Sequence, residues 1–174
     1  MKRSVPLLFV ILLALFSFGC NQGAPPSEQS AGDEPTRQTV MVVQGDESIE
    51  LYRHEVWAEV YRDGEWLSAD GIRAIGLLSD IAHQLPVVAF SDTLGLDIPA
   101  QIELNFIEVY DSDHNSVFKV STAEELVTSA GNLDSGTYYV AINATRRGEY
   151  IEPENKQNTY GEEYLFKMTV NAAG

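Results

Sequence analysis

The sequence has a single cysteine, Cys20, so it can form neither an internal disulfide nor a cysteine-based zinc cluster. Basic residues are scarce, because 11 lysines and arginines stand against 26 acids and give a formal net charge of −15. Lys2 and Arg3 are the only charged residues among the first twenty, so the remainder has 9 basic residues against 26 acidic ones, or −17. Such a chain lacks the basic excess that displaces counterions from nucleic acid or binds anionic lipid. We therefore expect no nucleic-acid partner.

The N-terminus has the parts of a secretory signal. A short positive segment precedes the apolar run 5–18, whose 14 residues are fewer than the ~20 that a permanent membrane span needs. Gly19-Cys20 resembles the lipobox of bacterial lipoproteins, although Ser17 stands where that family usually has leucine. The resemblance implies that 1–19 is a signal peptide and that Cys20 is acylated. The alternative is an ordinary signal peptide cut elsewhere, which leaves a free thiol.

Residues 20–38 form the predicted lipidated cysteine and tether. The segment after Cys20 is rich in Pro, Gly, Ser, Gln and Glu and has no large apolar residue. Such a composition cannot bury enough surface to offset chain entropy, so we expect a disordered tether. The chain would then be held by its lipid at the extracytoplasmic face of the membrane, in the cell envelope.

Residues 39–174 read as one mainly β domain, an antiparallel β-sandwich with one or two short helices. Asp63-Gly64 between alternating runs is the strongest hairpin signal. The alternation of 102–106 shifts phase at Ile107 and Val109, which either a β-bulge or the covering of both faces near that end would produce. Apolar residues every three positions predict a helix within 70–85, and Ser121 with Glu124 predicts a capped helix over 121–128.

The last strands alternate most clearly. In 137–145 the even positions share one face and the odd positions the other. In 162–170 the even positions from Tyr164 are expected to face inward, with Glu163 and Lys167 outward and Leu165 as the one apolar exception among the outward positions.

One segment carries a resemblance to immunoglobulin-like domains. Asp134, Gly136 and Tyr138 fall at the spacing of the run that opens strand F in that family, with Val140 in place of the family's cysteine. The resemblance implies an immunoglobulin-like sandwich in which the Tyr138 hydroxyl bonds back to the chain. The segment 160–167 (YGEEYLFK) also resembles the C-terminal hairpin of uncharacterised lipoproteins of Gram-positive bacteria, a resemblance that implies no known activity.

The segment 146–161 is predicted to be a long polar loop. It concentrates aromatic, amide and basic side chains, a composition typical of binding surfaces on rigid sandwiches. The candidate binding residues are Arg146, Arg147, Tyr150, Asn155, Lys156 and Tyr160. The alternative is an ordinary hairpin whose aromatic rings pack onto the end of the sandwich. Similarly, Trp57 and Tyr61 share one face of the first hairpin, either as an exposed strip or as a cap on the sheet.

No catalytic or metal-ligating set is predicted. Asp111, Asp113 and Asn115 begin like a calcium loop, but the later ligand positions do not fit, so a polar turn is the expected structure. The three histidines lack metal-ligand spacing, and paired acids such as Glu162-Glu163 suit a solvated surface in so acidic a chain. We expect no cofactor and no enzyme activity.

These expectations lead to a functional hypothesis. The chain would be a lipid-anchored, non-enzymatic domain that presents a binding surface to an envelope protein, peptide or glycan. The alternative is a structural or accessory subunit of a membrane complex, with no ligand of its own.

Overall fold

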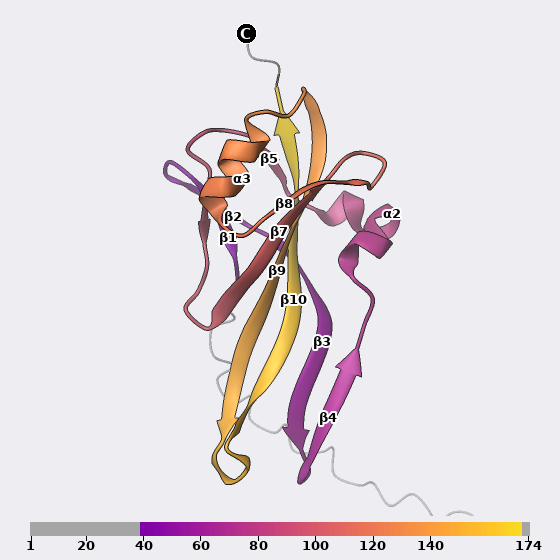
Figure 1. Cartoon of the computed structure of the whole chain (residues 1–174), viewed down its shortest axis with the longest axis vertical. Coiled ribbons are helices and arrows are strands. Elements are labelled where there is room, and N and C mark those ends of the chain that lie inside the picture. Colours follow the sequence, from indigo (N-terminus) through magenta and orange to yellow (C-terminus); the bar gives the residue numbers. More distant parts are fainter. Residues whose placement is uncertain (1–38, 172–174) are drawn as a thin grey trace, which may run out of the picture. The chain divides into compact units, whose positions relative to one another are not determined.

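The computed structural model describes residues 39–171, which belong to one compact unit, and the fold is mainly β (Figure 1). The predicted signal peptide, Cys20 and the tether lie outside the described residues. The strands are β1 (Met41–Gln44), β2 (Glu47–Glu50), β3 (Tyr52–Arg62), β4 (Glu65–Asp70), β5 (Val87–Ala89), β6 (Gly95–Asp97), β7 (Ile102–Tyr110), β8 (Ser116–Val120), β9 (Gly136–Ile151) and β10 (Lys156–Val170). The helical segments are η1 (Ala74–Leu77), α2 (Leu78–Ile81), η2 (Ala82–Gln84), α3 (Ala123–Ala130) and η3 (Glu152–Glu154). No helix in residues 39–171 combines the length and apolar character needed to cross a membrane.

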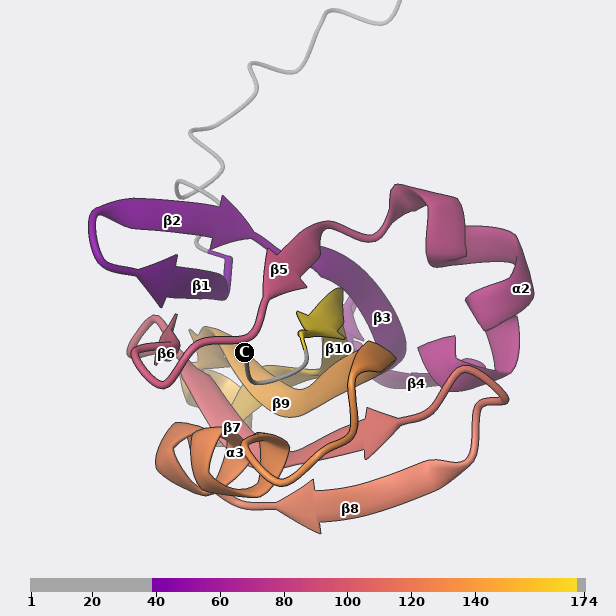
Figure 2. The same ribbon diagram turned by 90° about the horizontal axis from the view of Figure 1, so that it is seen from above.

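The strands form two sheets, as the predicted sandwich requires. The larger has the order β4-β3-β10-β9-β7-β8, antiparallel throughout, and β5 joins it by pairing in parallel with β10. The smaller has the order β2-β1-β6. Viewed from above, the small sheet lies over one face of the large one, and α3 closes one side by contacting both β6 and β8 (Figure 2). The mainly β, two-sheet architecture expected from the sequence is therefore confirmed.

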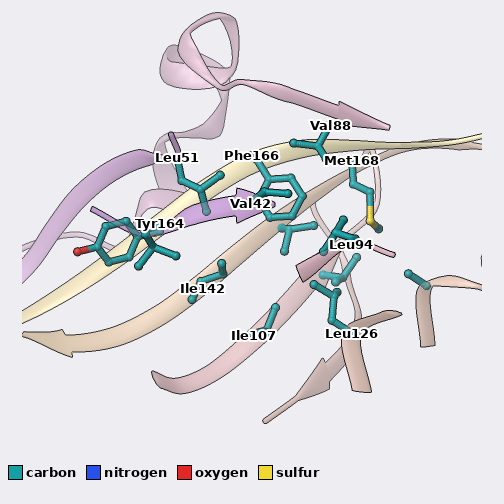
Figure 3. Close-up of a cluster of buried hydrophobic side chains, with 14 of the residues drawn as sticks. Val42, Leu51, Val88, Leu94, Ile107, Leu126, Ile142, Tyr164, Phe166 and Met168 are labelled. Carbon is teal, nitrogen blue, oxygen red and sulfur yellow. The ribbon is translucent and has the colours of Figure 1, made fainter. Parts of the chain in front are cut away.

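The main core lies between the two sheets (Figure 3). Val42 from the small sheet meets Ile107, Ile142 and Phe166 from the large one, and all four are fully buried. Because β7, β9 and β10 alternate, their other side chains point to the opposite, outer face of the large sheet. On that face the turns of η1, α2 and η2 cover a second, smaller cluster.

The central strand β10 is thus buried on both faces along its upper half. Glu163 and Leu165 point to the outer side of the sheet, as expected, but the helical turns cover that side here. Glu163 was expected outward and solvated, yet its side chain is fully buried. Leu165 packs with Leu78 and Ala141 beneath the helical turns. Periodicity identifies which residues share a face, but only the distant 74–84 segment decides that both faces are covered.

Several local predictions are confirmed. Asp63 and Gly64 both have positive φ in the β3–β4 turn, and the β7–β9 register shifts between Leu104 and Phe106, where a bulge was expected. The helix expected within 70–85 is three short consecutive turns rather than one helix. The second helix begins one residue later than predicted, because Thr122 rather than Ser121 is its N-cap.

The segment 146–161 is not a loop. β9 runs to Ile151 and β10 starts at Lys156, so most of the segment is a paired hairpin with a short turn. The β3–β4 hairpin lies beside it through the β3–β10 pairing, and both turns point to the same end of the fold (Figure 1). We call the strand segments 57–62, 65–70, 145–151 and 156–161 the arm. Its inner face continues the core side of the large sheet, and its outer face continues the side covered by the 74–84 turns.

Candidate functional site

The inner face of the arm begins at a buried carboxylate. Glu162 has no exposed surface and lies between two arginines from the flanking strands: Arg53 Nη2 on β3 and Arg146 Nε on β9 are each 2.7 Å from its Oε1. The Tyr164 hydroxyl donates a hydrogen bond to the other carboxylate oxygen. The guanidinium of Arg146 also stacks 3.9 Å from the centre of the Tyr160 ring. A buried charge needs such partners, and these interactions engage two of the six predicted binding residues, Arg146 and Tyr160.

The buried surroundings of Tyr164 change the pKa of its phenol group. Burial, together with the hydrogen bond to Glu162 and its negative charge, raises the pKa of Tyr164 well above its ordinary value. The hydroxyl therefore remains a donor to Glu162 throughout the physiological pH range. The cluster holds β3, β10 and β9 in register where the core ends and the arm begins.

A second buried carboxylate lies on the outer face, one residue further along. Glu163 accepts hydrogen bonds of 2.6 Å from both Arg73 Nε and the backbone N–H of Ala74. Arg73 also lies 3.5 Å from Glu108 and 3.4 Å from the Tyr110 hydroxyl. Glu163 thus fixes the start of η1 over the sheet.

Glu108 belongs to the same network. Its burial alone would raise the pKa of its carboxyl, but hydrogen bonds from Tyr110 and Ser116 and the charges of Arg73 and Lys119 outweigh burial and lower that pKa. Both fully buried carboxylates, Glu162 and Glu163, are thus held by arginine side chains.

Beyond this network, the outer face of the arm carries an aromatic ring in an unusual position. Trp57 is paired with Gly161 across β3 and β10. A β-carbon built at position 161 would lie 1.9 Å from indole Nε1 and 2.3 Å from both Cδ1 and Cε2. The indole therefore lies flat over the glycine, which is buried, while 37% of Trp57 remains exposed. Only a residue without a side chain permits this approach.

The aromatic surface continues toward the end of the arm. Tyr61 and Trp66 are directly paired across β3 and β4, with ring centres 5.5 Å apart. Lys156 reaches across from β10 to Glu59, at 2.5 Å, and its ammonium lies 4.2 Å from the Trp66 ring centre. Trp57 and Tyr61 thus form a partly exposed strip, and the Trp57 ring at the same time caps the sheet at Gly161, so each of the two sequence interpretations holds in part.

Polar side chains flank the rings on the same face. Arg147 on β9 pairs at 2.8 Å with Glu103 on β7, and both side chains are largely exposed. Asn105, the extra residue of the β7 bulge, donates to Asn143 Oδ1 at 3.0 Å and to Thr145 Oγ1 at 3.1 Å. These groups lie across β10 from Trp57.

The remaining predicted binding residues lie at the turn. Tyr150, half exposed, donates a hydrogen bond to Asn155, which adopts the left-handed conformation with φ of 49°. The six predicted residues therefore separate. Arg146 and Tyr160 serve the inner-face cluster, Arg147 and Lys156 lie on the outer face, and Tyr150 and Asn155 form the tip. They do not converge on one site.

The calcium-like segment is a closed turn. Asp111 Oδ1 accepts from the backbone N–H groups of Asp113 and Asn115, both at 2.9 Å. The backbone hydrogen bond from Asn115 is the main reason that the pKa of Asp111 is lowered. Within residues 39–171 no group of three or more His, Cys, Asp or Glu side chains is arranged to hold a metal ion.

An open depression on the surface lies between β8 and α3, lined by Lys119, Val120, Ser121, Glu124, Glu125, Thr128 and Ser129.

Sequence reasoning missed the residues that organise the arm. Glu162 and Glu163 were assigned to the solvated surface, and Arg53, Trp66 and Gly161 were not singled out. The one available signal was position: Glu162 falls on the inward phase of the 162–170 alternation, where an acid requires a partner.

Comparisons of the chain with protein-family models, with curated proteins and with solved structures gave no match.

Proposed function

We propose that the chain is a non-enzymatic binding domain, anchored by a lipid on Cys20 at the extracytoplasmic face of a bacterial membrane, and that it binds an envelope component through the outer face of its arm. The observation that carries the binding role is the exposed indole of Trp57 held flat over Gly161. An exposed aromatic ring on a rigid strand loses little conformational freedom on binding, which is why such rings dominate recognition surfaces.

We interpret the fold as immunoglobulin-like. In such domains a sheet has the strand order G-F-C-C′, and the tyrosine at the start of strand F bonds back to the chain. The order β10-β9-β7-β8 matches this arrangement, with β9 as strand F. The Tyr138 hydroxyl donates to the Asp134 carbonyl at 3.0 Å. The addition of β3 and β4 beyond β10 departs from the pattern, and it is this addition that makes the arm.

The alternative role as an accessory subunit receives less support. Obligate assembly requires a large contiguous apolar patch. Among residues 39–171 the large exposed aliphatic side chains belong instead to separate elements: Leu67 to β4, Ile72 to the following loop, Val87 to β5 and Val117 to β8.

The anchor and the binding face are tested separately. Mass spectrometry of the mature chain should find acyl groups on Cys20, and a Cys20→Ala chain should be released to the medium of the bacterial culture. Retention of that chain in the membrane would refute the anchor.

For the binding face, a photo-crosslinking amino acid is placed at Ser68, on the outer face of the arm, and, as the matched control, at Val117 on the edge of β8. Both positions are exposed. We expect irradiation of intact cells to give specific envelope adducts from position 68 and not from position 117. Absence of adducts from position 68, or the same adducts from both positions, would refute binding through the arm.

A further inference from the structure

The outer face of the arm is a continuous surface of aromatic and hydrogen-bonding groups. Sheet register places Asp70, Trp57, Gly161, Thr145 and Glu103 in one row across β4, β3, β10, β9 and β7. The next row toward the tip contains Ser68, Glu59, Thr159 and Arg147. The β10 residues of these rows are Gly161 and Thr159, whose side chains are absent or short, so no long side chain of β10 covers the surface beside Trp57.

The indole ring is supported from below. Gly161 receives one face of the ring, so the opposite face is the one left for a ligand. Tyr61 lies four residues along the same strand, about 13 Å away at the usual rise per residue. A ligand that contacts both rings must therefore be an extended chain rather than a single small ring.

The charges of this face limit the ligand further. Glu59 is paired with Lys156 and Glu103 with Arg147, so these four groups offer hydrogen bonds but little net charge. The chain as a whole is acidic at −15. An anionic polymer would be repelled, while a neutral ligand with hydroxyl or amide groups would find hydrogen-bond donors and acceptors among these side chains.

We infer that the outer face of the arm binds a neutral glycan chain, with the apolar face of one sugar ring stacked on Trp57 and another on Tyr61. This inference rests on the proposed binding function and names its ligand class. A pyranose ring has one face of C–H groups, which suits an aromatic ring, and a rim of hydroxyls, which suits carboxylates, amides and guanidinium groups. Thr145, Thr159 and the paired charges around the indole supply that rim with donors and acceptors.

The test uses the full chain in detergent micelles and isothermal titration calorimetry with three probes: chitohexaose and cellohexaose as neutral glycans, and hexagalacturonate as the anionic control. We expect saturable binding of at least one neutral hexamer and none of the anionic one. Trp57→Ala should weaken that binding by about tenfold or more, equivalent to ~1.4 kcal/mol. Leu67→Ala is the matched control, because Leu67 is exposed on the opposite face of the same hairpin.

A second variant distinguishes loss of the stacking surface from loss of the fold. Trp57→Phe keeps a ring over Gly161 with a smaller stacking area, so it should unfold near the temperature of the unmodified chain and bind with intermediate affinity. No binding of either neutral hexamer, or equal affinity in Trp57→Ala and Leu67→Ala, would overturn the inference. Loss of sugar binding together with protein adducts from position 68 would refute the glycan and leave the proposed binding function standing.

Discussion

Trp57 and Gly161 face each other across β3 and β10, and the indole occupies the space where a side chain at position 161 would be. This contact joins the two hairpins of the arm near the point where they leave the core. It also makes Trp57 part of the architecture and part of the proposed binding surface at once. A change on either residue should therefore be visible in the other.

Gly161→Ala should destabilise the fold by about 1–3 kcal/mol, the usual cost of forcing an extra carbon into a packed position. The displaced indole should also show red-shifted fluorescence, because it becomes more exposed. Urea unfolding and tryptophan emission measure the two effects. The matched control is Gly76→Ala, where the new β-carbon would meet only Ile72 Cγ2 at 3.4 Å. An equal loss in both variants would mean that the indole does not pack over Gly161.

Glu162→Gln should cost about 3 kcal/mol, near the lower end for breaking a buried ion pair, because it leaves Arg53 and Arg146 facing a neutral amide. Both arginines keep some solvent contact, with side chains 19% and 25% exposed, which moderates the loss. Denaturant unfolding measures it.

Glu103→Gln is the control for this experiment. Its pair with Arg147 is about 60% exposed on both sides and should contribute no more than ~1 kcal/mol. If the two substitutions cost the same, Glu162 does not act as a buried charge.

Local signals in the sequence predicted much of the fold. Asp63-Gly64 fixes its hairpin through backbone conformations that only a few residues adopt readily, and the phase shift before Ile107 marks a bulge within a single strand. Each of these features depends on neighbours in the chain. The two-sheet class followed from the same alternating patterns.

The candidate site depended on contacts between distant segments. The polar residues of 146–161 suggested a loop, but cross-strand partners such as Glu103 and Glu59 allow them to lie on strands. Likewise, nothing local to Glu163 indicates burial, since its partner Arg73 is 90 residues away. Register between β3 and β10 alone brings Trp57 over a glycine.

The stability supplied by Glu108 should depend on pH. Because its pKa is lower in the folded chain than the ordinary 4.5, its charged form stabilises the fold above that pH, and the contribution is lost as the pH falls through the folded-state pKa. The difference in unfolding free energy between the unmodified chain and Glu108→Gln should therefore be largest near neutrality. It should shrink steadily below about pH 4.5. Urea unfolding across this range measures it, and a gap of constant size would contradict the network with Arg73, Tyr110 and Ser116.

The N-cap of α3 is Thr122 in the structure, whereas the sequence predicted Ser121. Thr122 Oγ1 accepts the backbone N–H of Glu125 at 3.1 Å, and the Glu125 carboxylate accepts the N–H of Ser121 at 2.8 Å. The helix start is therefore held by Thr122 and Glu125, one residue later than Ser121 and Glu124, and the Glu125 carboxylate bonds the residue before the N-cap instead of the N-cap itself as in a capping box. Thr122→Ala should cost about 1 kcal/mol, because it leaves a helix N–H without its acceptor, whereas Ser121→Ala keeps the backbone group that Glu125 binds and should change stability little. Thermal unfolding of the two variants decides between the positions. A larger loss of stability from Ser121→Ala than from Thr122→Ala would show that Ser121 is the N-cap, as the sequence predicted.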